Sequence, residues 1–289
     1  MARRSLLFSP GDRPEMLRKA PASGADVVVF DLEDAVAPAR KDEAREAVAS
    51  LLGTDGFAPD CEVCVRVNPV GSGAAADLDA VCGRDAPDSV MLPKAERAGD
   101  VDDLADLLAD RGGVLPVIAV VESAAGVLHA EGVAAAEATD AVAFGAEDLA
   151  ADLGATRTEE GTEVLYAREH VVVAASAAGV DAIDTIHAAI EDEAGLAEAT
   201  EFAIELGYDG KMAIHPDQVP VVNDAFTPSR ERIAWAERVL AARDEAEAEG
   251  RGVFRVDGEM IDAPLIAQAE QVLDRARAAG LRDDDAHHS

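Results

Sequence analysis

Two short apolar stretches of the sequence end abruptly in carboxylates, the side chains that hold hard metal ions in proteins. The first reads P-V-I-A-V-V-E-S and ends at Glu122, and the second reads A-V-A-F-G-A-E-D-L and ends at Glu147 and Asp148. Short runs that are apolar on both faces are typical of buried parallel strands. In α/β folds the chemistry lies at the carboxyl ends of such strands. The pattern therefore favours a site in which carboxylates from two strands hold a divalent cation.

Polar side chains also end most of the other strand candidates. These side chains are Arg13, Asp31, Glu33, Asp34, Arg66, Asn68, Lys94, Asp184, His187 and His215. In a closed barrel all the carboxyl ends meet at one rim, which is where barrel enzymes place their active sites. We interpret the set as one functional rim, although strand ends in any fold meet solvent and tolerate charge.

Eight strand candidates alternate with stretches of helical spacing between residues 5 and 215. The strands are Ser5–Ser9, Asp26–Leu32, Glu62–Asn68, Ser89–Pro93, Val117–Glu122, Ala141–Gly145, Asp181–Ile186 and Lys211–His215. This alternation predicts an α/β fold, a closed (β/α)8 TIM barrel. A doubly wound open sheet is the alternative fold, but no glycine-rich nucleotide motif follows any strand.

The pattern changes after His215, so the tail is not a ninth barrel unit. It predicts a long helix over Arg230–Glu249, a hairpin that turns on Asp257-Gly258, and a last helix from about Pro264 to Ala279. We assign residues 1–219 to the barrel and residues 220–289 to a C-terminal helical extension. The final R-D-D-D-A-H-H-S is expected to be disordered, and a metal site at His287 and His288 is not expected.

The chain carries an extreme negative charge, with 58 acidic and 25 basic residues and a net charge of −33. Such a charge repels nucleic acid and anionic membranes, so neither is expected as a partner. The acids are spread along the predicted helices, which argues against disorder. Concentrated salt would screen their repulsion. We therefore expect a halophilic protein of a high-salt cytoplasm.

Signals of other protein classes are weak in this sequence. No apolar run has the length of a membrane span, and the N-terminal segment is too short and too polar for a signal peptide, which favours a cytoplasmic protein. The pair Cys61-x-x-Cys64 lies in a predicted strand, where positions three apart face opposite sides. With only Cys82 besides, a redox or zinc site is not expected.

A set of motifs in a fixed order identifies a family resemblance. The motifs are L-L-F-S-P-G-D-R-P, V-F-D-L-E-D-A-V-A-P-A-R-K-D-E-A-R, V-R-V-N, L-P-K, V-V-E-S-A-A-G-V, F-G-A-E-D-L-A-A-D-L-G, A-I-H-P-D-Q-V and M-I-D-A-P. Over essentially the whole chain the sequence resembles the citrate lyase β-subunit-like branch of the HpcH/HpaI aldolase superfamily, which includes malyl-CoA, β-methylmalyl-CoA and citramalyl-CoA lyases. One departure is Val-Glu-Ser where the family more often has Glu-Thr, and this change leaves Glu122 in place.

The resemblance implies a magnesium site and two catalytic residues. Glu122 and Asp148 would bind Mg²⁺, and Arg66 would contact the acyl and carboxylate oxygens of the substrate. Asp262 in M-I-D-A-P would be the catalytic acid/base, carried on a C-terminal lid that reaches into the neighbouring subunit of a trimer or hexamer. Two structural interpretations stay open: Arg66 could pair with Asp31 or Glu33, and Asp262 could cap the helix that follows it.

The resemblance also implies contacts for the rest of the substrate. Phe8, Ser9, Arg13 and Lys19 would lie near the coenzyme A thioester, and Glu147, Ile214 and His215 would face the substrate through their backbone. Apart from the resemblance, we interpret Glu33 and Asp34 as residues that hold the rim arginines or the waters of the metal rather than binding Mg²⁺ directly. Asp31 and Lys94 are expected beside them, around the site and not in direct contact with the metal.

The implied reaction breaks or makes a carbon–carbon bond in a 3-hydroxyacyl-CoA thioester such as malyl-CoA, with an acyl-CoA and a 2-oxoacid as the other partners. Mg²⁺ with two protein carboxylates keeps positions for the oxoacid, and a fixed guanidinium can stabilise the enolate oxygen of the thioester. The alternatives are a citrate lyase β subunit acting on a carrier-protein thioester, a malyl-CoA thioesterase, a synthase running the reverse reaction, and a catalytically silent assembly subunit. A pyruvate-type aldolase would leave the Phe8–Lys19 segment and the lid without a role.

Overall fold

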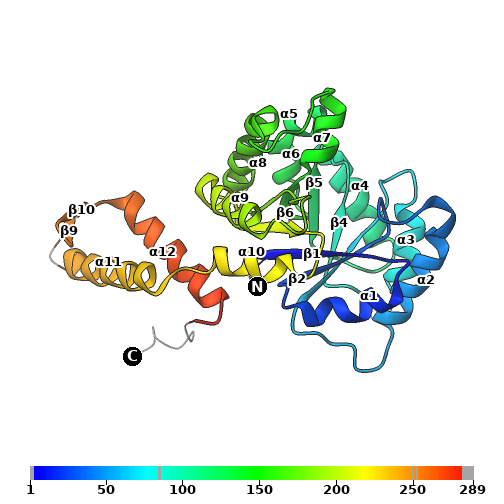
Figure 1. Ribbon diagram of the computed structural model, residues 1–289, viewed down its shortest axis with the longest axis horizontal. Coiled ribbons are helices and arrows are strands. Elements are labelled where there is room, and N and C mark those ends of the chain that lie inside the picture. The colour runs from blue at the N-terminus through cyan, green and yellow to red at the C-terminus, as the bar shows by residue number, and fades with distance from the viewer. Residues whose placement is uncertain (1–2, 84–85, 249, 252, 282–289) are drawn as a thin grey trace. The chain divides into compact units, whose positions relative to one another are not determined.

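The computed structural model describes residues 3–83, 86–248, 250–251 and 253–281, and within them it confirms the predicted barrel. Parallel strands close into one barrel in chain order (Figure 1). The strands are β1 (Ser5–Pro10), β2 (Val27–Asp31), β3 (Glu62–Arg66), β4 (Ser89–Leu92), β5 (Val117–Val121), β6 (Thr139–Phe144), β7 (Asp181–Asp184) and β8 (Gly210–Ala213). Closure is made by β1 and β8, in which Ser5 pairs with Lys211 and Leu7 with Ala213.

Helices cover the outside of the barrel (Figure 1). They are α1 (Pro14–Lys19), α2 (Lys41–Leu52), α3 (Ala74–Val81), α4 (Ala98–Ala109), α5 (Ala124–Leu128), α6 (Ala130–Ala134), α7 (Ala146–Leu153), α8 (Leu165–Ala178), α9 (Glu193–Leu206) and α10 (Gln218–Phe226). Short 3-10 turns lie at Ala20–Ser23, Pro38–Arg40 and Thr162–Val164. In the described part of the chain, no helix combines the length and the apolar character that a membrane span needs.

Alternating side chains of the strands build two apolar layers. One set, with Val29, Met91 and Ile118, fills the barrel interior, and the other, with Phe30 and Phe144, packs under the helices. Each buried side chain of this size contributes roughly 1.5–3 kcal/mol by leaving water. The interior layer fills the barrel below the carboxyl ends of the strands, so the side chains at and just beyond these ends are the ones that can reach the rim.

The cysteines follow the same alternation. Cys64 lies in the interior layer and Cys61 packs against the outer one. All three cysteines are free thiols. The expectation that the two side chains of the Cys61-x-x-Cys64 pair face opposite sides is confirmed.

Ion pairs close the amino end of the barrel. The guanidinium of Arg3 contacts Glu62 at 2.8 Å and Asp140 at 2.6 Å, and the Ser89 hydroxyl donates to Glu62 at 2.5 Å. At the start of β8, a Cβ on Gly210 would lie only 1.8 Å from the carbonyl oxygen of Arg3. The segment that carries Arg3 can therefore pass this strand only because residue 210 has no side chain.

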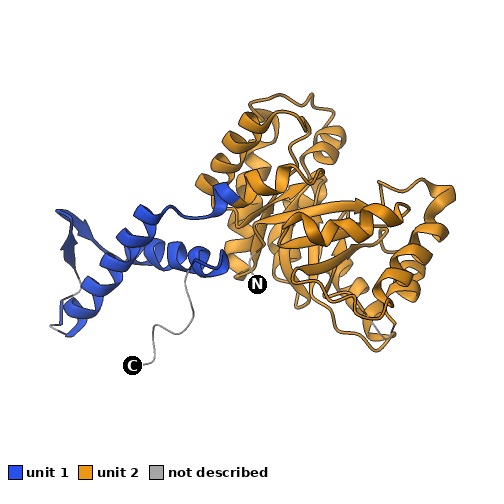
Figure 2. Cartoon of the chain, turned by 60° about the horizontal axis from the view of Figure 1, so that its bottom comes forward, with its two compact units in different colours: residues 1–2, 224–289 blue, residues 3–223 orange. Residues whose placement is uncertain are grey.

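The residues from 224 onward form a second compact unit, distinguished from residues 3–223 in Figure 2. It contains α11 (Arg230–Ala248), α12 (Ala263–Ala278) and an antiparallel hairpin of β9 (Phe254–Val256) and β10 (Glu259–Ile261). The predicted turn at Asp257-Gly258 is confirmed. Val239 and Leu273 are among the buried residues of the unit's own core. The final segment 282–289, with the predictions made for it, lies outside the described residues.

Gly210→Ala is expected to lower the free energy of unfolding by about 3 kcal/mol, because the new methyl group meets backbone that has no room to move. Gly132→Ala in α6 is the matched control, since its Cβ would lie 3.9 Å from the nearest atom, and it should be neutral or slightly stabilising. Denaturant unfolding of both variants measures the difference. Equal stability of the two variants would contradict the close approach at Gly210.

Candidate active site

A cavity of about 240 Å³ opens at the carboxyl ends of the barrel strands. It is lined by Phe8, Asp31, Asp34, Ala35, Arg66, Val120, Glu122, Gly145, Ala146, Glu147, Asp148, Thr185, Ile186, Met212 and Ile214. About half of the side chains that the sequence predicted for the rim are therefore brought together around one hollow; they are Asp31, Asp34, Arg66, Glu122, Glu147 and Asp148. The walls combine apolar side chains with an arginine and several carboxylates, as small-molecule sites do.

Arg66 is held by a bidentate ion pair at the end of β3. Its Nε donates to Asp31 Oδ1 at 2.8 Å and its Nη2 to Oδ2 at 2.6 Å. Asp31 in turn accepts the backbone amides of Glu33 and Ala35 at 2.8 and 3.1 Å. The guanidinium carbon also lies 4.9 Å from the ring centroid of Phe8. The structural pairing considered for Arg66 exists, and it leaves the guanidinium fixed in the cavity wall.

Glu33 and Lys94 extend this network along the rim. Glu33 is buried and contacts Nη1 of Arg66 at 3.3 Å and the ammonium of Lys94. The same ammonium lies 3.5 Å from Asp34. The predicted grouping of Asp34, Glu33 and Lys94 with the rim arginine is thus present in the geometry. The negative charges of Asp31 and Glu33 offset the positive charges of Arg66 and Lys94, and these contacts hold the Arg66 guanidinium in place.

The backbone of Lys94 has a second function. Its φ of +55° is a left-handed conformation that non-glycine residues rarely adopt. In this conformation its N–H donates to Glu122 Oε1 at 2.8 Å. Lys94 therefore connects the Arg66 network, through its side chain, to the carboxylate at the end of β5, through its backbone. Strained backbone of this kind is common at functional sites.

Glu122 is buried at the centre of the site, with 5% of its surface exposed. Burial raises the pKa of its carboxyl to about 7, and repulsion from Asp148 adds to the rise, whereas the hydrogen bond from Lys94 opposes it. Gly145 touches it closely: a Cβ there would lie 2.5 Å from the Glu122 Cβ and 2.7 Å from Oε2. The carboxylate is therefore confined by backbone on two sides.

Glu122 and Asp148 suit a hard divalent cation. Within the described residues, Glu122 Oε2 and the exposed Asp148 carboxylate accept no hydrogen bond and form no ion pair, although both side chains line the cavity. The described chain has no cluster of three side chains of the metal-binding types. Two carboxylates with water or substrate in the other positions match the preference of Mg²⁺. A cation would also relieve the repulsion that raises the pKa of Glu122.

The other predicted residues lie outside the cavity lining. Ser9 is buried and, by the alternation of β1, faces the helix layer rather than the interior that Phe8 faces. Arg13 and Lys19 are exposed beside and within α1, with Arg13 Nε 3.7 Å from Asp12. His215 is partly exposed and its Nδ1 accepts the amide of Asp217 at 3.2 Å.

The carboxylates of Glu147 and Asp262 differ in their contacts. The Glu147 side chain accepts a hydrogen bond from Arg157 Nε at 2.9 Å, although the residue lines the cavity at the start of α7. Asp262 belongs to the second unit, where it occupies the N-cap position of α12. Its carboxylate is exposed and makes no capping hydrogen bond. The alternative that it serves only as a cap is therefore not supported by a hydrogen bond.

Sequence reasoning assigned the wrong polar residue of β7 to the rim. Asp184 is fully buried on the helix side of the strand, where Arg168 donates to it twice at 2.8 Å and Lys211 once at 2.6 Å. The next residue, Thr185, lines the cavity instead. A period of two places neighbouring residues on opposite faces, so only the register of the strand distinguishes them.

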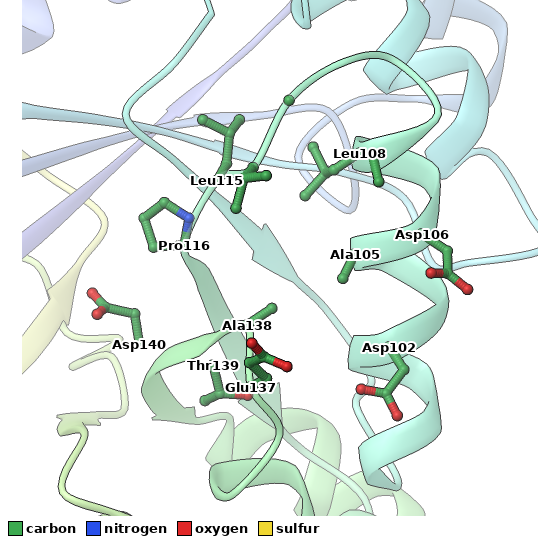
Figure 3. Close-up of a pocket in the computed structure, with 13 residues that line it drawn as sticks. Asp102, Ala105, Asp106, Leu108, Leu115, Pro116, Glu137, Ala138, Thr139 and Asp140 are labelled. Carbon is green, nitrogen blue, oxygen red and sulfur yellow. The ribbon is translucent and has the colours of Figure 1, made fainter.

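A larger hollow of about 620 Å³ lies at the other end of the barrel, between α4 and the segment that leads into β5 (Figure 3). Its wall is mainly apolar, with Leu108, Leu115 and Pro116, and Asp102 and Asp106 lie along its α4 side. Four carboxylates line it, Asp102, Asp106, Glu137 and Asp140, but its described lining has no lysine, arginine or histidine. The cavity at the carboxyl ends of the strands, in contrast, combines carboxylates with an arginine.

This fold and site define a (β/α)8-barrel protein with an arginine and carboxylate centre at the usual catalytic rim. A family model described as HpcH/HpaI aldolase/citrate lyase matches residues 4–216, and the chain belongs to this family.

Named relatives cover nearly the whole chain. The mitochondrial citramalyl-CoA lyase of Rattus norvegicus is 39% identical over 290 residues, 94% of this chain and 85% of that protein. The citrate lyase subunit beta of Escherichia coli is 37% identical over 291 residues, 98% of this chain and 96% of that protein. Protein CitE from Mycobacterium tuberculosis, solved in complex with magnesium, acetoacetate and coenzyme A, superposes with a TM-score of 0.80 at 42% identity, over 96% of this chain and 98% of that one.

The free energy of unfolding of metal-free Glu122→Gln is expected to exceed that of metal-free wild type by an amount that grows as the pH rises. The folded pKa of about 7 lies above the ordinary value of 4.5, so the folded wild type holds an extra proton between these values. The stability linked to that proton is complete below about pH 4.5 and is lost as the pH rises through about 7. The difference between variant and wild type should grow by about 3 kcal/mol across this window.

Denaturant unfolding in the presence of a chelator, from pH 4.5 to 8, measures this difference. Glu159→Gln, at an exposed position, is the control and should show a flat difference. A Glu122→Gln difference that stays constant over the same range would contradict the raised pKa.

Proposed function

We propose that this protein is a Mg²⁺-dependent carbon–carbon lyase that cleaves or forms a 3-hydroxyacyl-CoA thioester, with an acyl-CoA and a 2-oxoacid as the other partners. One observation carries the proposal: a fixed guanidinium, Arg66, shares one cavity with the carboxylates of Glu122 and Asp148, which form no ion pair within the described residues. The names of the relatives, a citramalyl-CoA lyase and citrate lyase β subunits, support it, as do the magnesium and coenzyme A in the CitE structure.

Glu122 and Asp148 would hold the metal ion. When bound there, Mg²⁺ acts as a Lewis acid toward the oxygens of the 2-oxoacid. The two carboxylates leave coordination positions open for those oxygens. The backbone at Glu147, Ile214 and His215 faces the same region in this proposal and orients the acid.

Arg66 acts on the thioester. In the cleavage direction the Asp262 carboxylate takes the proton of the 3-hydroxyl, the bond between C2 and C3 breaks, and the electron pair moves into the thioester enolate, which later receives the proton back at C2. The guanidinium stabilises the negative charge on the enolate oxygen. Because Asp31 and Phe8 already hold it, little reorganisation is needed as that charge develops.

Asp262 supplies the proton to the α-carbon of the enolate, or removes it in the synthetic direction. The carboxylate is exposed and not used as a helix cap, which suits a group that must meet a substrate. We propose that residues 220–289 form a lid over a barrel of residues 1–219. The lid would cross to the neighbouring subunit of a homotrimer or of a hexamer built from trimers.

Coenzyme A would bind beside α1. Phe8 and Ser9 lie in β1, and Arg13 and Lys19 place exposed positive charge at the start and end of the helix that follows. Charged groups of this kind match the phosphates of the cofactor. The rim between this segment and Glu122 is formed by Asp34, Glu33 and Lys94.

Citrate lyase β subunits among the relatives favour a second candidate, in which the substrate is carried on an acyl-carrier protein. The same residues would serve that reaction. Copurification distinguishes the two, since a subunit of such a complex should retain an α subunit and a carrier protein.

We propose that the protein works in the cytoplasm of a cell with multimolar salt, because a net charge of −33 requires screening. Lowering KCl from about 3 M, where the Debye length is below roughly 3 Å, to 0.1 M should lower the melting temperature by more than about 10 °C. Differential scanning calorimetry tests this, and an unchanged melting temperature would contradict the proposal.

The activity test uses a panel of 3-hydroxyacyl-CoA thioesters in high KCl, with and without Mg²⁺, and follows release of the 2-oxoacid. We expect magnesium-dependent cleavage of at least one thioester. Asp262→Asn should lower kcat at least roughly 100-fold, since a positioned acid/base contributes 10²–10⁴-fold. Glu259→Gln, an exposed acid on the same hairpin, is the matched control and should leave kcat unchanged.

Absence of cleavage by a folded, metal-loaded protein would overturn the CoA lyase. It would favour the carrier-protein subunit if partners copurify, and a silent assembly subunit if none do. Release of free coenzyme A without carbon–carbon cleavage would indicate a thioesterase.

A further inference from the structure

Helix α7 carries Asp148 in its first turn, yet its N-cap residue has no side chain that could accept a hydrogen bond from the first turn. The first N–H groups of a helix need acceptors, which a serine, threonine, asparagine or aspartate at the N-cap normally supplies. Here the N-cap is Gly145. Since a Cβ at this position would lie 2.5 Å from the Glu122 Cβ, the glycine is forced by its contact with Glu122. The same contact that builds the site removes the ordinary cap.

Thr185 supplies the missing acceptor from the neighbouring strand. The N–H of Ala146, the first residue of α7, donates to Thr185 Oγ1 at 3.2 Å in a buried hydrogen bond. Thr185 directly follows β7, is 7% exposed and lines the cavity. Ala146 and Asp148 share one helical turn, so the position of this amide affects the direction in which Asp148 points.

The backbone of Thr185 is itself anchored. The Lys211 ammonium donates to the Thr185 carbonyl at 2.7 Å and to the Asp184 carboxylate at 2.6 Å. Arg168 holds the other side of Asp184 with two hydrogen bonds of 2.8 Å. Lys211 and Asp184 are almost completely buried, where a pair with good geometry is strongly held. The hydroxyl is therefore placed by the barrel wall and does not depend on α7.

We infer that Thr185 is a positioning residue that replaces the N-cap of α7 and thereby orients Asp148 toward Glu122. The inference rests on the proposed function, in which these two carboxylates hold Mg²⁺. Groups that orient metal ligands without touching the metal commonly change its affinity 10–100-fold when removed. Thr185 acts in this way by holding the backbone amide of Ala146, and it does not bond to the Asp148 carboxylate.

The test separates the hydroxyl from the volume of the side chain. Thr185→Val keeps the shape and removes the acceptor, whereas Thr185→Ser keeps the acceptor and removes a methyl group. Thr200→Val in α9 is the matched control, because Thr200 is buried too and its hydroxyl donates to the carbonyl of Leu196, away from the site. Isothermal titration calorimetry with Mg²⁺ gives the dissociation constant of each full-length variant, with Asp148→Asn as the reference for loss of a ligand.

We expect Thr185→Val to weaken Mg²⁺ binding roughly 10- to 100-fold. Thr185→Ser should stay within about threefold of wild type, and Thr200→Val should be unchanged. If Thr185→Val does not fold, Thr185→Cys takes its place, because a thiol of nearly the same size is a poor acceptor and should weaken binding in the same way. Mn²⁺ electron paramagnetic resonance should report a changed coordination in the Val or Cys variant and not in the Ser variant.

Two results would overturn the inference alone: wild-type affinity in Thr185→Val or Thr185→Cys, or a loss in Thr185→Ser as large as in Thr185→Val. A wild-type chain that does not bind Mg²⁺, or that binds it as tightly after Asp148→Asn, would overturn the proposed metal site and the role of Thr185 with it. The two failures are therefore distinguishable in the same set of titrations.

Discussion

Burial of the Glu122 carboxylate is the constraint on which the rest of the site depends. An ionised carboxylate in an apolar interior is unfavourable unless partners compensate for the lost water. The barrel supplies one backbone N–H, from Lys94, and this requires the left-handed conformation of that residue. The raised pKa of Glu122 indicates that one hydrogen bond does not suffice. A further positive charge is therefore needed to stabilise the ionised form of the Glu122 carboxylate, and we propose that Mg²⁺ supplies it.

The same constraint explains the distribution of the neighbouring charges. Positive charge from Arg66 and Lys94 is already shared with Asp31 and Glu33, so it does not neutralise Glu122 through direct contact. The cavity is thus divided into a guanidinium side and a carboxylate side. The proposed substrate matches this division, because an enolate develops at one end of it and the oxoacid forms at the other. A reaction that needs only one charged group would not require both sides of the cavity.

Charged side chains have different roles at the two ends of the barrel. At the amino end Arg3 is surrounded by carboxylates and closes the barrel, while Gly210 allows the chain to pass. At the carboxyl end the charges line an open cavity. Barrels generally use one end for stability and the other for function, and the backbone contacts at Gly210 and Gly145 illustrate each use. Gly210 leaves room for the segment before β1, and Gly145 leaves room for the side chain of Glu122.

The pattern of eight apolar runs separated by helical stretches was enough to predict the barrel, because such runs have few other ways to bury their residues. The pattern also predicted that Arg66, Glu122 and Asp148 lie at one rim, because all three come at or shortly after the carboxyl ends of buried strands, and the structure brings them into the lining of one cavity. The fold decided which of two adjacent residues faces the cavity, as with Asp184 and Thr185 or Phe8 and Ser9. It also decided the left-handed backbone of Lys94 and the need for glycine at position 145. These features depend on strand register and on contacts between residues far apart in the chain, and no local pattern specifies distances of that kind.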